Sequence, residues 1–124
     1  MNEQSRQKKW GYELWFANNE EYCGKLLCIN QHRCSSDGAF HYHKIKDETF
    51  FVIEGTLELE YFENGIFYSI SLQQFQSFRV YPNVKHRFST ESKQCKFIEA
   101  STTHREEDSY RCEWDKEKGE WIEG

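Results

Sequence analysis

The sequence has no apolar run long enough to span a membrane, and its start, MNEQSRQKKWGYE, lacks the apolar core of a signal peptide. Positive charge is also scarce, because 16 Lys and Arg residues stand against 21 Asp and Glu residues and leave a net charge of -5. This acidic balance argues against nucleic acid or an anionic membrane as the main partner. We therefore expect a soluble, cytoplasmic protein that binds neither nucleic acid nor a membrane.

The chain contains no C-x-x-C pair. Its five cysteines are an odd number, and they occupy positions 23, 28, 34, 95 and 112. Without a secretory signal, this pattern favours free buried thiols over disulfides or a zinc cluster.

Internal repeats, linkers and low-complexity tracts are also absent, and 124 residues are enough for one ordinary domain. We expect a single domain over residues 1–124, with a barrel at about 20–101, an N-terminal arm at 1–19 and a C-terminal arm at 102–124. The first few residues have the character of a flexible arm. The charged C-terminal segment predicts either a short helix or an arm that packs Trp114 and Trp121 on a neighbouring surface.

No segment in the middle of the chain keeps a helical period over a dozen residues. Several short segments are instead rich in β-branched and aromatic residues, which is typical of strands. These segments are 22–31, 48–55, 56–63, 66–72, 75–81, 85–89 and 95–101. Asn64-Gly65 is a strong signal for a tight hairpin turn between two of them. At least seven short strands predict an all-β sandwich or barrel.

Two histidines stand one residue apart at the start of HYHKIKDETFFVIEG (41–55). Side chains in a strand alternate between its two faces, so His41 and His43 should point the same way. Glu48 begins the next predicted strand, and His86 follows Pro82 on a later one. Three imidazoles and a carboxylate suit one divalent transition metal (Zn, Mn, Fe, Co or Ni), with one or two positions open to water or substrate. The simpler alternative for each histidine is a surface or hydrogen-bonded residue.

The order and spacing of these residues resemble the cupin superfamily. The stretch 41–55 (H-x-H, four residues, E, six residues, G) is similar to the first cupin motif, and Pro82 with His86 is similar to the second. The resemblance implies a small antiparallel jelly-roll β-barrel. It also implies that the metal is held by His41, His43, Glu48 and His86. The sequence departs from the family at two turns, where Ser35 and Phe75-Gln76 replace its usual glycine and glycine-aspartate.

Three flanking segments resemble the cupins related to type II mannose-6-phosphate isomerases. These segments are KKWGYELWFA (8–17), FIEAS (97–101) and EDSYR (107–111). The resemblance implies a sugar or sugar-phosphate ligand, with aldose–ketose isomerisation or epimerisation as the expected reaction.

Isomerisation needs a base that moves a proton between adjacent carbons. Glu99 is the first candidate, provided that its side chain points inward, and Lys25 and Lys85 are alternatives. Arg87 and Arg111 could hold a phosphate, since arginine forks match phosphate oxygens. The family resemblance favours Arg111, whereas Arg87 is suggested only by its neighbour in the second motif. Each of these residues could instead be an ordinary solvated or paired charge.

Two other functions fit the same residues. Three histidines and a glutamate also serve cupin oxygenases and oxidases that use Fe or Mn. A non-catalytic module that binds a carbohydrate or metabolite is the third possibility, because fold alone does not fix function. We also expect a homodimer, the commonest soluble oligomer, with the terminal arms available for exchange.

Overall fold

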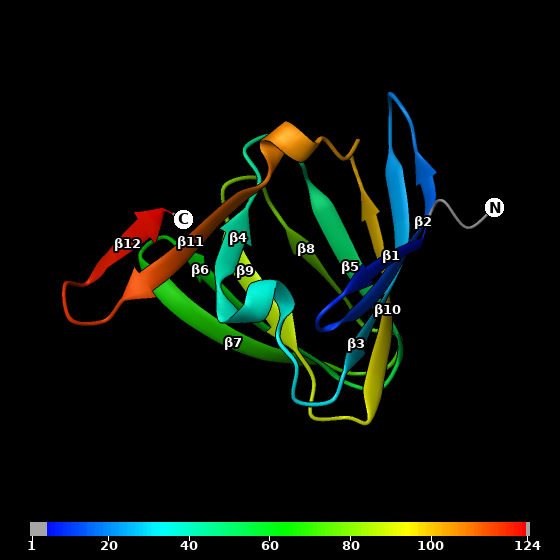
Figure 1. Ribbon diagram of the computed structural model, residues 1–124, viewed down its shortest axis with the longest axis horizontal. Helices are drawn as coiled ribbons and strands as arrows, with labels where there is room; N and C mark the ends of the chain where they lie inside the picture. The colour runs from blue at the N-terminus through cyan, green and yellow to red at the C-terminus, as the bar shows by residue number, and fades with distance from the viewer. Residues whose placement is uncertain (1–4, 124) are drawn as a thin grey trace.

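The computed structural model describes residues 5–123, except for the side chains of residues 36 and 37. The first four residues, where a flexible arm is expected, lie outside this range. The described chain forms two six-stranded antiparallel sheets that face each other (Figure 1). Helical structure within it is limited to 3₁₀ turns at Ser35–Gly38 and Glu106–Asp108. The all-β prediction is therefore confirmed.

The first sheet has the strand order β1-β2-β3-β10-β5-β8. Its strands are β1 (Ser5–Lys8), β2 (Gly11–Asn18), β3 (Cys23–Asn30), β5 (Glu48–Glu54), β8 (Ser77–Val80) and β10 (Gln94–Ser101). The second sheet has the order β12-β11-β4-β9-β6-β7. Its strands are β4 (Phe40–Tyr42), β6 (Leu57–Glu63), β7 (Ile66–Leu72), β9 (Lys85–Ser89), β11 (Tyr110–Asp115) and β12 (Glu120–Glu123). No helix among the described residues is long and apolar enough to cross a membrane.

The hairpin predicted at Asn64-Gly65 joins β6 to β7. Glu63 pairs with Ile66, so the loop has two residues, and both have positive φ (53° and 78°). Positive φ at both positions is the requirement of a type I′ turn, whose twist matches that of the flanking strands.

The two ends of the described chain form hairpins rather than irregular arms. The β1–β2 hairpin extends the first sheet beside β3, and the β11–β12 hairpin extends the second sheet beside β4. In Figure 1 they lie on opposite sides of the molecule. Trp121 packs edge-on against Phe40 and Phe62, and Trp114 against Phe67, with ring centroids 5.2–5.3 Å apart. The C-terminal tryptophans therefore pack on a neighbouring surface, the second of the two arrangements expected.

The interior between the sheets is divided into an apolar half and a polar half. The apolar half is built from fully buried side chains of both sheets, namely Phe50, Val52, Leu57, Leu59, Phe88 and Phe97. The buried polar residues lie towards the other end, namely Lys25, His43, Lys46, Glu48, His86 and Glu99. Strand register brings polar side chains of neighbouring strands together, because Glu99 pairs with Lys25 of β3. Buried charges are tolerated only when they are paired, so the polar half is a candidate site.

The two turns that depart from the family pattern are accommodated locally. The Ser35 hydroxyl accepts a hydrogen bond from the Phe88 backbone N–H at 2.9 Å. Phe75 has a φ of 67°, in the left-handed region that glycine adopts most easily, and its ring stacks on Phe51.

Gly55, at the end of β5, offers a direct test of the fold. Its φ is 82°, and a Cβ there would lie 2.6 Å from the carbonyl oxygen of Gln94. Gly65 has a similar φ of 78°, but a Cβ at this position would have no heavy atom of the described residues within 4 Å. We expect Gly65→Ala to lower the free energy of unfolding by about 1–2 kcal/mol, from backbone strain alone. Gly55→Ala should cost about 1–3 kcal/mol more because of the clash. Urea unfolding would measure both, and equal losses would contradict this account.

Candidate metal centre

Three imidazoles converge in the polar half of the interior. His41 lies on β4, His43 directly follows that strand, and His86 lies opposite His41 on β9. Strand alternation turns all three side chains to the same face. Their ligand nitrogens lie within 4.8 Å of one another, so this cluster could hold a metal ion.

Backbone carbonyls fix the orientation of two of these rings. His43 Nδ1 lies 2.7 Å from the carbonyl oxygen of Asp108, and His86 Nδ1 lies 2.9 Å from that of Val84. A carbonyl can only accept a hydrogen bond, so each Nδ1 carries the proton and donates it. In the neutral ring, Nε2 then holds the lone pair, which is the arrangement of a histidine ready to bind a metal.

The Glu48 carboxylate faces the same point. Its Oε2 lies 3.1 Å from His86 Nε2 and 3.6 Å from His43 Nε2. Among the described residues, neither Glu48 Oε2 nor His86 Nε2 has a hydrogen-bond partner of good geometry, although both are buried. With Nδ1 protonated, a neutral His86 places one acceptor against another, which is unfavourable unless a cation lies between them. The residues present therefore fit a divalent metal.

Electrostatics favours the ligand forms of these side chains. Burial lowers the pKa of His41 and His43, and for His41 the nearby imidazoles lower it further. Burial alone would raise the pKa of Glu48, but the facing imidazoles and Lys46 hold it well below its usual range. At neutral pH the His41 and His43 imidazoles are therefore uncharged and the Glu48 carboxylate is ionised, as metal binding requires.

Asp108 holds the loop that connects these ligands. Its buried carboxylate accepts hydrogen bonds from the backbone N–H groups of Lys44, Ile45 and Lys46, at 2.8–3.2 Å. Its carbonyl oxygen accepts the His43 Nδ1 proton. One residue of the C-terminal segment thereby fixes both the loop from His43 to Glu48 and the orientation of the His43 ring.

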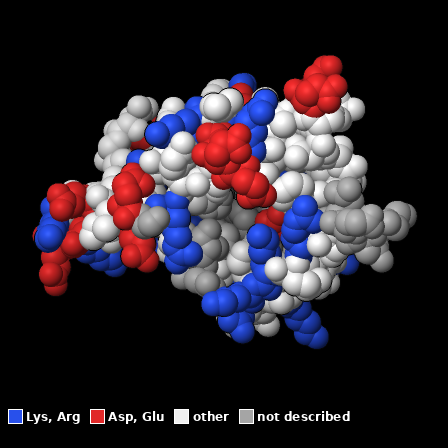
Figure 2. All heavy atoms as spheres, turned by 45° about the horizontal axis from the view of Figure 1, so that its top comes forward, with Lys and Arg blue, Asp and Glu red and all other residues white. Residues whose placement is uncertain are grey.

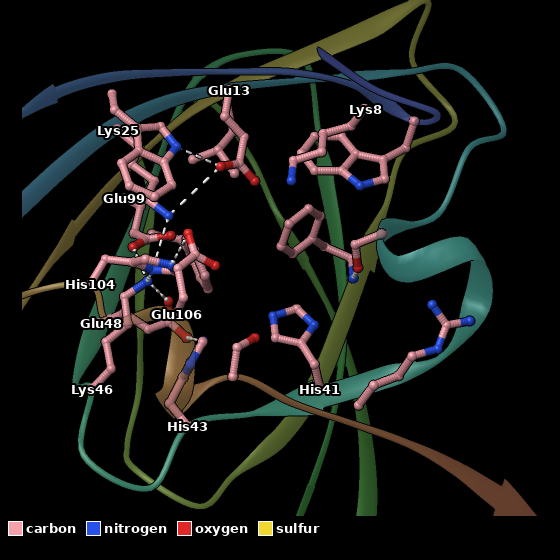
Figure 3. Close-up of a pocket in the computed structure, with 18 of the residues that line it drawn as sticks. Lys8, Glu13, Lys25, His41, His43, Lys46, Glu48, Glu99, His104 and Glu106 are labelled. Atoms are coloured by element: carbon pink, nitrogen blue, oxygen red, sulfur yellow. Dashed lines mark hydrogen bonds and ion pairs between the residues drawn. The ribbon is translucent and has the colours of Figure 1, made fainter. Parts of the chain in front are cut away.

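His41, His43 and Glu48 border a cavity of about 490 Å³ (Figure 3). Beside Glu48, the ammonium group of Lys46 forms a buried ion pair with Glu99 at 2.6 Å and lies 3.7 Å from Glu48 Oε1. Burial alone would lower the pKa of Lys46, but the two carboxylates outweigh it and raise the pKa, so the ammonium stays charged. The cavity thus contains a charged Lys–Glu pair directly next to the candidate metal ligands.

A second buried lysine, Lys25, lies near Glu13 in the cavity wall (Figure 3). The Lys25 ammonium group is 3.2 Å from His104 Nδ1 and 4.0 Å from the centre of the Trp15 ring. Lys46 lies 3.1 Å from the same nitrogen of His104. Burial, followed by these two positive charges, lowers the pKa of His104 to about 3, so this imidazole is neutral.

The cupin domain model matches residues 32–101, which is more than half of the chain. The chain belongs to the cupin family. A comparison of the sequence with curated proteins finds no match.

Solved cupin-like structures share the fold at low sequence identity. KdgF from Halomonas sp. superposes with a TM-score of 0.65 at 16% identity, covering 77% of this chain and 81% of that one. The oxalate decarboxylase of Bacillus subtilis gives a TM-score of 0.76 at 13% identity over 86% of this chain, and that of Lactobacillus farciminis gives 0.73 at 15% over 85%. This cupin spans only 29% and 32% of those two chains. At such identities the likeness establishes the fold alone. The narrower resemblance to type II mannose-6-phosphate isomerases gains no support from it.

The structure brings some of the predicted residues to the cavity and leaves others away from it. Glu99 and Lys25 are buried and line the cavity, and Arg111 lines its exposed edge. Lys85 and Arg87 flank His86 on β9, so alternation sends their side chains to the opposite face of the strand. The Lys85 ammonium lies over the rings of Tyr42 and Trp121. Arg87 pairs with Glu60 and donates to the carbonyl oxygen of Gly38.

Sequence reasoning missed Lys46 and left His104 unassigned. Lys46 lies in the loop before β5, where strand alternation gives no guide to the direction of a side chain. His104 follows β10 in an irregular segment, and no periodicity signals where its ring points. Asp108 was not predicted as a functional residue, and its carboxylate accepts hydrogen bonds from backbone N–H groups.

We expect the purified protein to contain close to one divalent transition metal per chain, and His86→Ala to lose it. Elemental mass spectrometry would measure both. His32→Ala is the matched control, because the His32 side chain is exposed and pairs with Glu91 on the surface. A wild-type protein that stays metal-free after reloading with Zn, Mn, Fe, Co and Ni would contradict the assignment.

Asp108→Ala should weaken both the fold and the metal site. Removing the carboxylate leaves buried N–H groups without an acceptor, which should lower the free energy of unfolding by about 1–3 kcal/mol. Metal affinity should fall about tenfold or more, since the support of His43 is disturbed. Glu107→Ala, at the exposed neighbouring position, should change neither quantity. Unfolding curves and competition with a chelator would show whether the two effects occur together.

Proposed function

We propose that this cupin is a metal-dependent isomerase or epimerase of a sugar or sugar phosphate. The observation that carries the proposal is the buried Glu99–Lys46 pair beside the candidate metal ligands. It supplies a carboxylate that can accept a proton and a cation next to it, within a cavity large enough for a monosaccharide. The narrower sequence resemblance described above points to the same class of ligand.

His41, His43 and His86 would hold the metal, with Glu48 as the fourth ligand. When bound, a divalent metal would polarise the carbonyl group of the sugar and lower the cost of removing the proton beside it. This is the chemistry that aldose–ketose isomerisation and epimerisation next to a carbonyl both require.

Glu99 is the proposed base. Its Oε2 accepts hydrogen bonds from Lys46 and from the Ser101 hydroxyl, at 2.6 Å and 3.0 Å. We assign Oε1 to the proton transfer, because both of these contacts use the other oxygen. Glu99 would take the proton from the carbon next to the carbonyl. In isomerisation it would return this proton to the former carbonyl carbon, while the hydroxyl proton of the first carbon passes to the former carbonyl oxygen. In epimerisation the proton would return to the other face of the same carbon. Lys46 would hold the carboxylate in place throughout.

The test is proton exchange in deuterated water. Metal-loaded protein should introduce deuterium at the carbon next to the carbonyl of at least one member of a panel of neutral and phosphorylated aldoses and ketoses, as followed by NMR. Glu99→Gln should bind metal normally but exchange at least about a hundredfold more slowly, the usual contribution of a general base. Glu54→Gln, exposed at the end of β5, should behave like wild type.

Absence of exchange across the whole panel would overturn the proposal. Sugar binding without exchange would point instead to a non-catalytic binding module. Oxygen uptake that depends on added Fe(II) would point to an oxygenase. The homodimer expected from the sequence stays a prediction, which light scattering on the purified protein would test.

A further inference from the structure

Two buried ammonium groups approach a single acceptor in the cavity wall. Lys25 Nζ and Lys46 Nζ lie 3.2 Å and 3.1 Å from His104 Nδ1, and each lysine is only 3% exposed. The Nδ1 of a neutral imidazole has one lone pair and accepts one hydrogen bond well. The wall of the cavity therefore has more ammonium donors than this nitrogen can satisfy.

Of the two lysines, Lys25 is the one that has too few hydrogen-bond acceptors. Lys46 has a second strong partner, the Glu99 carboxylate at 2.6 Å. The remaining described contacts of Lys25 are the face of the Trp15 ring and Glu13 Oε1, which is 3.7 Å away and too far for a hydrogen bond. That oxygen already accepts a bond from Trp15 Nε1 at 2.7 Å. A buried ammonium group without enough acceptors is costly unless a ligand supplies one.

The charged side chains that line the cavity indicate the sign of that ligand's charge. Five cationic side chains line it (Lys8, Lys9, Lys25, Lys46 and Arg111) against four carboxylates (Glu13, Glu48, Glu99 and Glu106). Lysine and arginine side chains also flank a hollow on the face that Figure 2 shows. The cavity is thus net positive in a chain whose net charge is -5, and a divalent metal would make it more so. Such a cavity attracts anions.

We propose that Lys25 binds an anionic group of the substrate, a carboxylate or a phosphate, so that the substrate is a sugar acid or a sugar phosphate and not a neutral sugar. The inference that the ligand is a sugar rests on the proposed function. The anion-binding role of Lys25 rests only on the contacts of Lys25 in the cavity wall. Lys25 thereby binds substrate instead of transferring the proton. It lies on β3 and is held by Trp15 of β2, and both strands are outside the stretch 32–101 matched by the cupin model.

Calorimetric titration of metal-loaded protein with three polyols would test this assignment. Gluconate carries a carboxylate, sorbitol 6-phosphate carries a phosphate, and sorbitol is their neutral counterpart. We expect at least one of the two anions to bind about tenfold or more tightly than sorbitol, which reflects a charge-assisted hydrogen bond. Whichever anion binds identifies the acidic group. Lys25→Met should remove this preference, while Lys96→Met, on the outward-facing side of the adjacent β10, should keep it.

Equal binding of all three polyols, or an unchanged anion preference in Lys25→Met, would overturn the inference. A wild-type protein that binds neither anion at millimolar concentration would also overturn the inference. The proposed function would not fail with it, because deuterium exchange on neutral sugars could still occur. Should Lys25→Met fail to fold, wild-type protein with ¹³C-labelled lysines still decides the question. The binding anion must then shift the Lys25 side-chain signal and leave that of Lys96 in place.

Discussion

The polar half of this barrel depends on the buried ion pair between Lys46 and Glu99. Either charge alone, at this depth, would destabilise the fold by several kcal/mol. Together, at 2.6 Å, they neutralise each other and tie the loop before β5 to β10. Because Glu99 has this partner, Glu48 can turn its Oε2 towards the imidazoles. The candidate metal site therefore exists because the neighbouring charges are already compensated.

Strand alternation made part of the candidate metal site predictable from sequence. His41 and His43 share a face by spacing alone, and Glu48 and His86 follow from the order of the motifs. The same rule predicts that the two neighbours of His86 on β9 point away from it, and the structure places Lys85 and Arg87 there. Period-two reasoning is reliable within a regular strand such as β9, since successive side chains there point to opposite faces of the sheet.

The residues that could not be predicted lie where periodicity ends. His104 and Asp108 belong to the segment between β10 and β11, and their positions depend on contacts with loops far away in sequence. The terminal hairpins were expected as arms because their partners, β3 and β4, are chosen by tertiary packing. Local sequence carries little information about such pairings, since the energy that fixes them comes from burial across the sheet.

The candidate metal ligands and much of the opposite wall of the cavity come from different parts of the chain. This separation explains why similarity of fold says little about the substrate. Every candidate metal ligand lies within the stretch 32–101 that defines the family. Much of the opposite wall comes from outside it, from the β1–β2 hairpin and β3. Lys8, Glu13 and Lys25 enter the cavity from this wall (Figure 3). A shared core can thus keep one metal chemistry while the added strands decide which molecule reaches it. In this chain, the net positive charge of the wall favours an acidic molecule.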